Sequence, residues 1–474
     1  MRKIAYYFLA LALGMSLYGL TDRSPAAAQE LSPIETLGKA IFFDTNLSTP
    51  PGQSCASCHA PEVGFTGPDS EINALGAVEP GAVPGRFGNR KPPNAAYAGD
   101  SPDLYYDPDY NLEMEMGSWI GGMFWDGRAT GWSLGDPLAE QAMGPFLNPL
   151  EMNMPGKRQV CIRVAHSDYA LLFEEVWGPG SLDFVKDPEG TYERIALSIA
   201  AYERSAEVNP FTSKFDLFWN NAKAAGKDIT LITAAGIPGG MGGGGGGGMG
   251  GGGGMGGPQN NPARWEYYKG LGLTDEELQG LAVFNDTSRG NCASCHSISS
   301  PENSESPPLL TDFSYHNLGI PKNPDNPFYT MPRKWNPDGA AWVDTGLGGF
   351  LKASGEKGQV YEPEMGKFKT PTLRNVDLRP YPEFLKAYGH NGFFKNLDQM
   401  DGIIHFYAWR AMMDTGGMGG GGMGPNPDMF PPPELDENRI EMQPFNFMMD
   451  GAKIMAFLKT LSDGHFEPDD QPGM

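Results

Sequence analysis

The sequence carries little positive charge for its length. Its 474 residues include 35 lysines and arginines against 58 aspartates and glutamates, so the formal net charge at pH 7 is −23. The phosphates of nucleic acids and anionic membrane surfaces repel so acidic a chain. The composition therefore argues against a nucleic-acid-binding protein and leaves room for a basic protein partner.

Long apolar runs are scarce as well. The run at 4–20 follows Arg2 and Lys3 and precedes three alanines at 26–28, and no second run of this kind follows. A positive start, an apolar run and a small-residue site are typical of a secretory signal peptide. We therefore expect residues 1–28 to be a signal peptide and the mature protein to be exported to a bacterial periplasm. The alternative is a retained N-terminal anchor.

The chain has only five cysteines, and four of them lie in two copies of one motif, CASCH, at 55–59 and 292–296. The pattern C-x-x-C-H is the attachment signature of c-type haem, in which the adjacent histidine ligates the iron. A thioredoxin-like dithiol or half a zinc site would not explain a histidine directly after both cysteine pairs. With Cys161 left alone, no disulfide framework can form.

We therefore predict two covalently bound haems c. The attachment residues are Cys55, Cys58, Cys292 and Cys295, and the axial histidines are His59 and His296.

A wider repeat surrounds the two motifs. The segment LGKAIFFD (37–44) precedes the first copy and LQGLAVFND (278–286) precedes the second, both with helical spacing of apolar residues. Thr274 and Glu277 form a capping-box pattern before the second. We predict a mainly α fold of two cytochrome c-like helical haem domains packed face to face, at 29–215 and 263–474.

Glycine-rich tracts interrupt this pattern at 239–257 and 416–424. Such tracts have no side chains with which to pack a core. We therefore expect a flexible Gly/Met-rich linker at 216–262 and a flexible Gly/Pro-rich insertion at 415–434.

The ordered set of motifs resembles the bacterial di-haem cytochrome c peroxidase family, including its side-chain-oxidising relatives of the methylamine dehydrogenase maturation type. The resemblance covers about 33–465 apart from the glycine tracts. It implies a peroxide-reacting N-terminal haem and a C-terminal haem that receives and stores electrons. The motifs that carry it are LGKAIFFDTNLS (37–48), FWDGRA (124–129), EQAMGPFLNPLEM (140–152), RIALSIAAYERS (194–205), FSYHNLGIP (313–321), GKFKTPTLRNV (366–376) and HNGFFKNL (390–397).

The resemblance also implies catalytic residues. Glu151 would be the acid-base group beside the first haem, with Gln141 and Pro145 nearby, and Trp125 would lie between the two haems. The alternatives are a solvated loop glutamate and an ordinary core tryptophan. Six inserted residues, GWSLGD (131–136), separate FWDGRA from the Glu151 motif.

One departure from the family concerns the first haem. Many members carry a histidine that blocks this iron until the other haem is reduced, but here the position is Leu75, and no histidine lies between His59 and His166. We therefore expect the first haem to be open as made.

The distal ligand of the second haem is left open among Tyr407, His405 and Met400, with Tyr407 favoured by the alignment of HFY (405–407). Methionine would raise the potential of this haem, and tyrosinate would lower it. The family also binds calcium between its domains. The corresponding stretch, NRKPPN (89–94), has Lys91 near the expected ligand, so a calcium ion is an optional cofactor here.

The leading functional prediction is a peroxidase that reduces hydrogen peroxide to water with electrons from a small periplasmic redox protein, a cytochrome c or a cupredoxin. The first alternative is an oxidase that uses peroxide to modify Trp or Tyr of a partner protein. The second is a di-haem electron-transfer cytochrome, which would need no acid-base group such as Glu151. The oligomeric state is open, with a homodimer as one option.

Overall fold

The computed structural model describes residues 30–111, 116–234, 264–301, 305–414, 430–443 and 445–466. The predicted signal peptide and both glycine tracts lie outside these residues. Within them, no helix is long and apolar enough to cross a membrane. The fold is mainly helical, as predicted, with two small antiparallel sheets.

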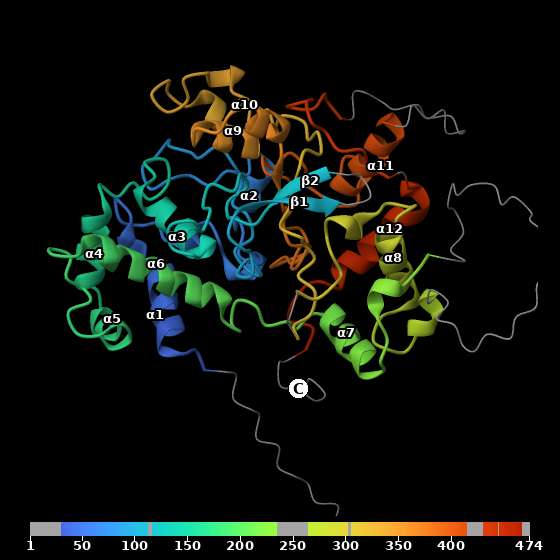
Figure 1. The fold of residues 1–474 in the computed structure, drawn as a ribbon, viewed down its shortest axis with the longest axis horizontal. Helices are drawn as coiled ribbons and strands as arrows, with labels where there is room; N and C mark the ends of the chain where they lie inside the picture. Colours follow the sequence, from blue (N-terminus) through green and yellow to red (C-terminus); the bar gives the residue numbers. More distant parts are fainter. Residues whose placement is uncertain are drawn as a thin grey trace, which may run out of the picture.

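The helices form two groups in chain order, with most of the first group on the left of Figure 1 and most of the second group on the right or at the top. The first group is α1 (Pro33–Phe42), α2 (Ser70–Ala74), α3 (Pro137–Leu147), α4 (Lys157–Ala165), α5 (Ala170–Trp177) and α6 (Pro188–Arg204). The second is α7 (Lys214–Ala224), α8 (Asp275–Asn285), α9 (Gly346–Ala353), α10 (Gly358–Tyr361), α11 (Ile403–Asp414) and α12 (Phe447–Lys459). The strands are β1 (Tyr105–Asn111), β2 (Met116–Ile120), β3 (Tyr315–His316) and β4 (Phe368–Lys369).

The sequence repeat corresponds to one helix crossing that occurs twice. Helix α1 packs on α6 and α8 packs on α12, and in each crossing a glycine lies against the backbone of the partner helix. A Cβ atom at Gly38 would lie 1.9 Å from the carbonyl oxygen of Ser198, and one at Gly280 would lie 1.9 Å from that of Lys453. The two matched glycines therefore let each helix pair approach to backbone contact.

Capping boxes start both repeated helices. Thr274 and Glu277 cap α8 reciprocally, as predicted, and Ser32 and Glu35 cap α1 in the same way. Each box satisfies backbone N–H groups that have no partner inside the helix. The predicted helices before the two CASCH motifs are thus present.

Part of the expected linker is folded. Residues 214–224 form α7, which starts with a capping box between Ser213 and Asp216. Phe218, Ala222 and Ile229 are buried in the core of the second helix group. The prediction of a linker from 216 was wrong for the described part, 216–234, because apolar residues at helical spacing precede the glycine tract.

The expected insertion at 415–434 also ends earlier than predicted. Phe430 is buried, and its ring centroid lies 5.2 Å from that of Phe406 and 5.3 Å from that of Trp409 on α11. Phe430 has a large apolar side chain that packs on α11, whereas glycine has no side chain to pack. Residues 430–434 therefore belong to the packed part of the chain.

Candidate functional site

The two CASCH motifs adopt the same local structure. In each, the first cysteine begins a single 3₁₀ turn, Cys55–Ser57 or Cys292–Ser294, and the second cysteine caps its end. The histidine that follows donates from Nδ1 to a backbone carbonyl, His59 to Phe65 (3.1 Å) and His296 to Leu310 (3.0 Å). This bond fixes the ring and leaves Nε2 available to a metal. Burial lowers the pKa of both histidines, to about 4 for His59, which favours the neutral form that can ligate iron.

A cavity of about 850 Å³ opens beside the second motif. Its wall contains Cys292, Cys295 and His296. The part of the wall that suits a flat apolar ring is formed by Phe284, Leu318, Ile320, Leu397, Ile403, Phe445, Ile454 and Leu458. The volume lies in the range of small-molecule and cofactor sites. The attachment cysteines, the free Nε2 and the apolar wall together fit a covalently held haem.

Among the three candidates for the distal ligand, the structure brings Tyr407 to this cavity. Tyr407 lies in the wall, where burial and then Cys295 and Cys292 raise the pKa of its phenol. His405 instead donates to the carbonyl of Met400, and its ring packs 4.5 Å from that of Phe447. The side chain of Met400 is 46% exposed, and neither His405 nor Met400 lines the cavity.

Glu151 lies near the first motif. It is in the turn after α3, the helix that carries Gln141 and Pro145. Burial raises the pKa of the Glu151 carboxyl, while Arg128 and a hydrogen bond with Asn148 oppose the rise. The Glu151 carboxylate in turn contributes to the raised pKa values of the Cys55 and Cys58 thiols. The structure therefore brings a partly buried carboxyl group and the first attachment cysteines together.

The inserted loop 131–136 is anchored by Glu140. The carboxylate of Glu140 accepts hydrogen bonds from the backbone N–H groups of Gly131 (2.7 Å), Ser133 (2.6 Å) and Leu134 (2.9 Å). Because the loop is tied to the first turn of α3, it is held at the end of the helix opposite to Glu151. No local sequence pattern indicates this role of Glu140.

Trp125 and Lys91 are hydrogen-bonded to each other, and both line the cavity beside the second motif. Trp125 is 9% exposed, lines the cavity and donates from Nε1 to the carbonyl of Lys91 (2.8 Å). The Lys91 ammonium is buried and donates to Thr66 Oγ1 (2.7 Å) and to the carbonyl of Pro92 (3.0 Å). Burial lowers the pKa of Lys91 to about 8, and its charge contributes to the lowered pKa of His59. The Lys91 ammonium therefore lies in the stretch where the resemblance suggests calcium. Its positive charge does not favour a calcium ion beside it.

Arg90 was missed by the sequence reasoning. Its guanidinium contacts Asp126 of the FWDGRA motif (2.6 Å) and binds Asp344 with two hydrogen bonds of 2.6 Å. Arg90 and Asp126 belong to the first half of the chain and Asp344 to the second. The two ion pairs of Arg90 therefore connect the segment that contains Trp125 to the second half. The 254-residue separation from Asp344 left no local signal.

The structure also places three other residues from the sequence analysis, His390, His166 and Leu75. His390 lines the cavity, stacks on Phe368 at 3.5 Å and accepts through its carbonyl from the backbone N–H of Lys91 (2.9 Å). His166 caps the C-terminal end of α4, where its Nδ1 donates to the carbonyl of Ile162 (2.7 Å). Leu75 is 59% exposed, and its carbonyl accepts from Lys395.

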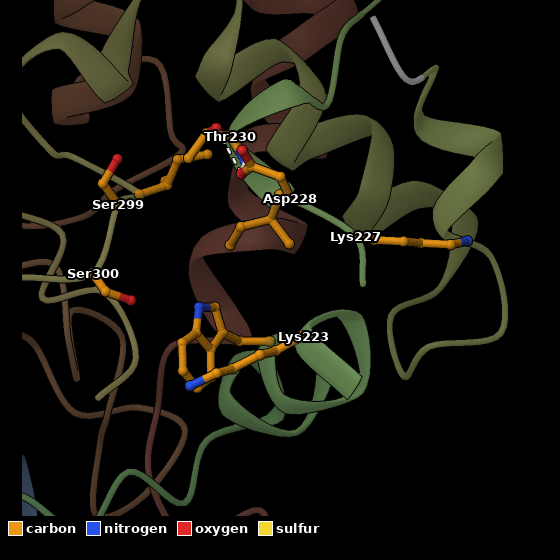
Figure 2. Close-up of a pocket in the computed structure, with 9 residues that line it drawn as sticks. Lys223, Lys227, Asp228, Thr230, Ser299 and Ser300 are labelled. Atoms are coloured by element: carbon orange, nitrogen blue, oxygen red, sulfur yellow. Dashed lines mark hydrogen bonds between the residues drawn. The ribbon is translucent and has the colours of Figure 1, made fainter. Parts of the chain in front are cut away.

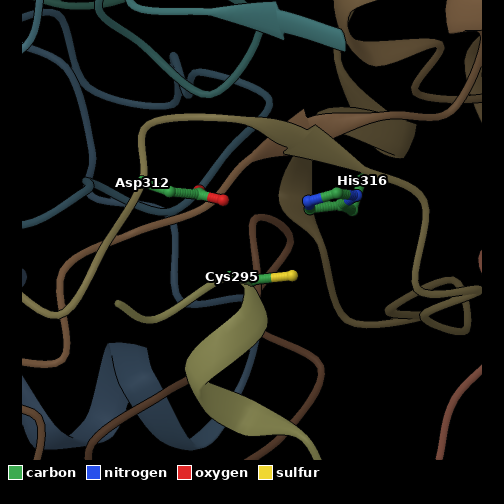
Figure 3. Close-up of side chains that lie close together, drawn as sticks. All are labelled: Cys295, Asp312 and His316. Carbon is green, nitrogen blue, oxygen red and sulfur yellow. The ribbon is translucent and has the colours of Figure 1, made fainter. Parts of the chain in front are cut away.

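Cys295, Asp312 and His316 lie close together, with their possible ligand atoms all within 4.8 Å of one another (Figure 3). Cys295 is an expected haem attachment, so this group is part of the second haem site and not a separate metal centre.

A second, smaller hollow of about 220 Å³ lies at the surface beside α7 (Figure 2). Two lysines line it, but Lys223 is paired with Glu305 and Lys227 donates to the carbonyl of Tyr267. With both ammonium groups engaged, this hollow has no evident ligand.

Comparison with known proteins places these features in a family. A model of di-haem cytochrome c peroxidases matches residues 33–224. Methylamine utilization protein MauG of Paracoccus denitrificans is 30% identical over 467 residues, which cover 97% of this chain and 95% of that protein. The chain belongs to the di-haem cytochrome c peroxidase family.

Other family members agree with this assignment. Cytochrome-c peroxidase IdrP2 of Denitromonas iodatirespirans is 24% identical over 81% of this chain and 75% of its own length. The diheme peroxidase BthA of Burkholderia thailandensis superposes with a TM-score of 0.62 at 25% identity, over 94% of this chain and 92% of that chain. Membership in this family of oxidoreductases implies that this enzyme carries two c-type haems.

Proposed function

We propose that the protein reduces hydrogen peroxide to water at the N-terminal site, with electrons that enter through the C-terminal site from a small redox protein. Each turnover takes up two electrons and two protons and releases two waters. The observation that carries the proposal is the partly buried Glu151 carboxyl beside Cys55 and Cys58, because an electron-transfer site needs no acid-base group.

The residues divide the work as follows. Cys55, Cys58 and His59 would hold the N-terminal haem, and Cys292, Cys295 and His296 would hold the C-terminal one. Bound haem supplies the electrons that cleave the peroxide O–O bond. Glu151 takes the proton from one peroxide oxygen and returns it to the departing oxygen, which then leaves as water.

Three further residues have supporting roles in this proposal. Gln141 and Pro145 on α3 shape the peroxide site. Trp125, bonded to Lys91 and exposed to the C-terminal cavity, assists electron transfer between the two sites.

The test is Glu151→Gln, which keeps the size and polarity of the side chain but removes the proton acceptor. Peroxide reduction should fall by roughly 10²-fold or more, the usual scale for a general acid-base group, with haem content unchanged. Glu62→Gln, at an exposed glutamate of the same half, is the matched control and should retain activity. Full activity of Glu151→Gln would rule out this role. Glu140 is unsuitable as a control because it anchors the 131–136 loop.

A second candidate function is a peroxide-dependent oxidase that modifies Trp or Tyr of a partner protein. It is favoured by Tyr407, a potential tyrosinate ligand in the C-terminal cavity, and by the similarity to MauG along nearly the whole chain. Tyrosinate ligation lowers the haem potential and suits storage of oxidising equivalents.

Tyr407→Met should raise the midpoint potential of the C-terminal haem in a spectroelectrochemical titration, within the span of about 0.8 V that axial ligands set. His405→Ala and Met400→Leu should leave it unchanged. A reversed pattern would reject Tyr407 as the ligand.

Rapid oxidation of a reduced small cytochrome c or cupredoxin by peroxide would favour the peroxidase. Slow oxidation of both, with fast consumption of peroxide in the presence of a protein substrate, would favour the oxidase.

We also propose that residues 1–28 direct export to the periplasm, where such a partner would be met. The buried Lys91 ammonium leaves no need for calcium between the halves, so chelation should not change the haem spectra. A homodimer is compatible with this proposal and is tested by the mass in solution.

A further inference from the structure

We propose that Tyr110 is a redox-active tyrosine that relays single oxidising equivalents between the C-terminal haem cavity and the protein surface. This role rests on the proposed function, because peroxide is the source of the oxidising equivalents. It concerns Tyr110 and Asp312, which lie outside the sequence motifs, although Ser314 and His316 beside them belong to FSYHNLGIP (313–321).

A bulge in the β1–β2 pair directs Tyr110 inward. Asp107 pairs with Ser118 and Asn111 with Met116, so residues 108–110 lie opposite the single residue Gly117. Extra residues in one strand re-aim side chains at that point. Tyr110 lines the cavity together with Cys295 and His296, whereas Tyr105 and Tyr106, before the bulge, are about half exposed.

The β1–β2 pair is fixed to the half of the chain that forms the cavity. Ile120 makes a β-bridge with Ser314, and the backbone N–H of Gly121 donates to the carbonyl of Phe313 (3.1 Å). These bonds lie next to Asp312, so they hold Tyr110 and its partner in register.

Tyr110 has a proton acceptor in place. Its hydroxyl donates to Asp312 Oδ2, and Ser314 Oγ donates to Asp312 Oδ1 (2.6 Å). Ser314 Oγ also lies 2.8 Å from His316 Nε2, and Figure 3 shows Asp312 and His316 on the two sides of Cys295. Burial, with Asp312 as the next cause, raises the pKa of Tyr110, and burial raises that of Asp312. The phenol therefore keeps its proton at rest, and the carboxylate has an increased affinity for it.

Tyr110 and Asp312 together account for the electron and the proton that move in the relay step. One electron leaves the Tyr110 ring for an oxidising equivalent held in the cavity, which is thereby reduced by one electron. The phenolic O–H bond breaks, its proton moves to Asp312 Oδ2, and a neutral tyrosyl radical remains. An electron from the partner and the return of the proton restore the phenol. Transfer to a bonded carboxylate avoids a tyrosyl cation in a partly buried site, which would be costly.

Tyr106 lies between Tyr110 and the protein surface in the proposed relay. A Cβ at Gly117 would lie 2.3 Å from the Tyr106 hydroxyl, so this hydroxyl lies against the residue opposite the bulge that contains Tyr110. The Tyr106 ring also packs edge-on against Trp119, with centroids 5.8 Å apart. Because Tyr106 is 49% exposed, it can exchange an electron with a docked partner.

A carboxylate partner alone does not single out Tyr110. Tyr97, Tyr169 and Tyr202 also donate to carboxylates, those of Asp463, Asp44 and Glu207. None of these three lines the C-terminal cavity. Tyr110 both donates to a carboxylate and lies in the cavity wall. Tyr202 donates to a carboxylate but does not line the cavity, so it is the matched control.

The test is freeze-quench EPR of the di-haem protein after mixing with hydrogen peroxide, with ring-deuterated tyrosine incorporated to identify tyrosyl radicals. Peroxide consumption and haem content are recorded on the same samples. The wild-type protein should give a tyrosyl signal that narrows on deuteration. The signal should fall to background in Tyr110→Phe, which lacks the phenolic proton, and in Asp312→Asn, which lacks the acceptor. It should persist in Tyr202→Phe.

Three results would overturn the role of Tyr110. An unchanged signal in Tyr110→Phe would assign the radical elsewhere. Peroxide consumption without any tyrosyl signal in the wild-type protein would exclude a tyrosine relay and leave the proposed function intact. A failure of the wild-type protein to consume peroxide would reject the proposed function, and the relay with it.

Discussion

Glu151 can accept a proton only while its carboxyl group is ionised, and its surroundings set the pH at which this occurs. Burial raises its pKa above the ordinary value of about 4.3. As the pH falls through this raised pKa, the carboxyl becomes protonated and the first proton transfer is lost. Activity should therefore decline on the acid side at a higher pH than for a solvated glutamate.

The measurement is the pH profile of kcat/KM for peroxide, which reports on the free enzyme. The acid limb should be present in the wild-type protein and in Glu62→Gln. In Glu151→Gln the residual rate should lack this limb. The same limb in Glu151→Gln would mean that another group, such as the buried Glu203 with a pKa raised to about 8, controls the profile.

At the scale of helices, the two domains depend on the glycines at the α1–α6 and α8–α12 crossings. In a helix interior, Gly→Ala ordinarily stabilises by up to about 1 kcal/mol. At Gly38 and Gly280, however, the new methyl group would lie 1.9 Å from a backbone carbonyl oxygen, so the helices must separate. Overpacking of this kind costs about 1–3 kcal/mol or more, which outweighs the gain in propensity.

Gly38→Ala and Gly280→Ala should therefore each lower the melting temperature of the protein. Thr36→Ala and Glu276→Ala, at exposed positions of the same two helices, are the controls and should change it little. If a glycine variant melted at or above the wild-type temperature, the close helix contact at that crossing would be refuted.

The elements that the sequence predicted are those with a local signal. The CASCH motifs specify His59 and His296, and the capping box with apolar spacing specifies α8. Helix α7 was assigned to the linker because the adjacent glycine tract dominated the composition, although Ser213 and Asp216 form a capping box.

The residues that sequence reasoning missed depend on contacts between distant segments. Asp312 meets Tyr110 across 202 residues, and Asp344 meets Arg90 across 254. The NRKPPN stretch indicates Lys91 only as a residue near an expected calcium ligand, because nothing local predicts that its ammonium is buried against Thr66. The Tyr110–Asp312 and Arg90–Asp344 pairs form only when the two halves pack together, and periodicity within one segment does not encode any of these contacts.

At the scale of the whole molecule, the described residues on the two sides of the first glycine tract lie next to each other. Thr233 and Arg264 form a parallel β-bridge. Because the ends already lie side by side, a much shorter connection should span them at little cost in loop entropy. Deletion of 239–257 should leave the haem content and the peroxide reactivity of the N-terminal haem unchanged.

Haem content by pyridine haemochrome and peroxide consumption would check this deletion. Loss of activity with both haems retained would show that the tract itself contributes to turnover or to partner docking.

The central claim is that the N-terminal haem is open and that Glu151 serves it. It is tested most directly by EPR and stopped-flow mixing of the as-isolated diferric protein with hydrogen peroxide. Because Leu75 stands where many family members have a blocking histidine, the resting protein should contain a high-spin haem and should react without prior reduction. Glu151→Gln should keep the high-spin signal and lose the fast reaction. A wholly low-spin resting protein that reacts with peroxide only after reduction would contradict the account.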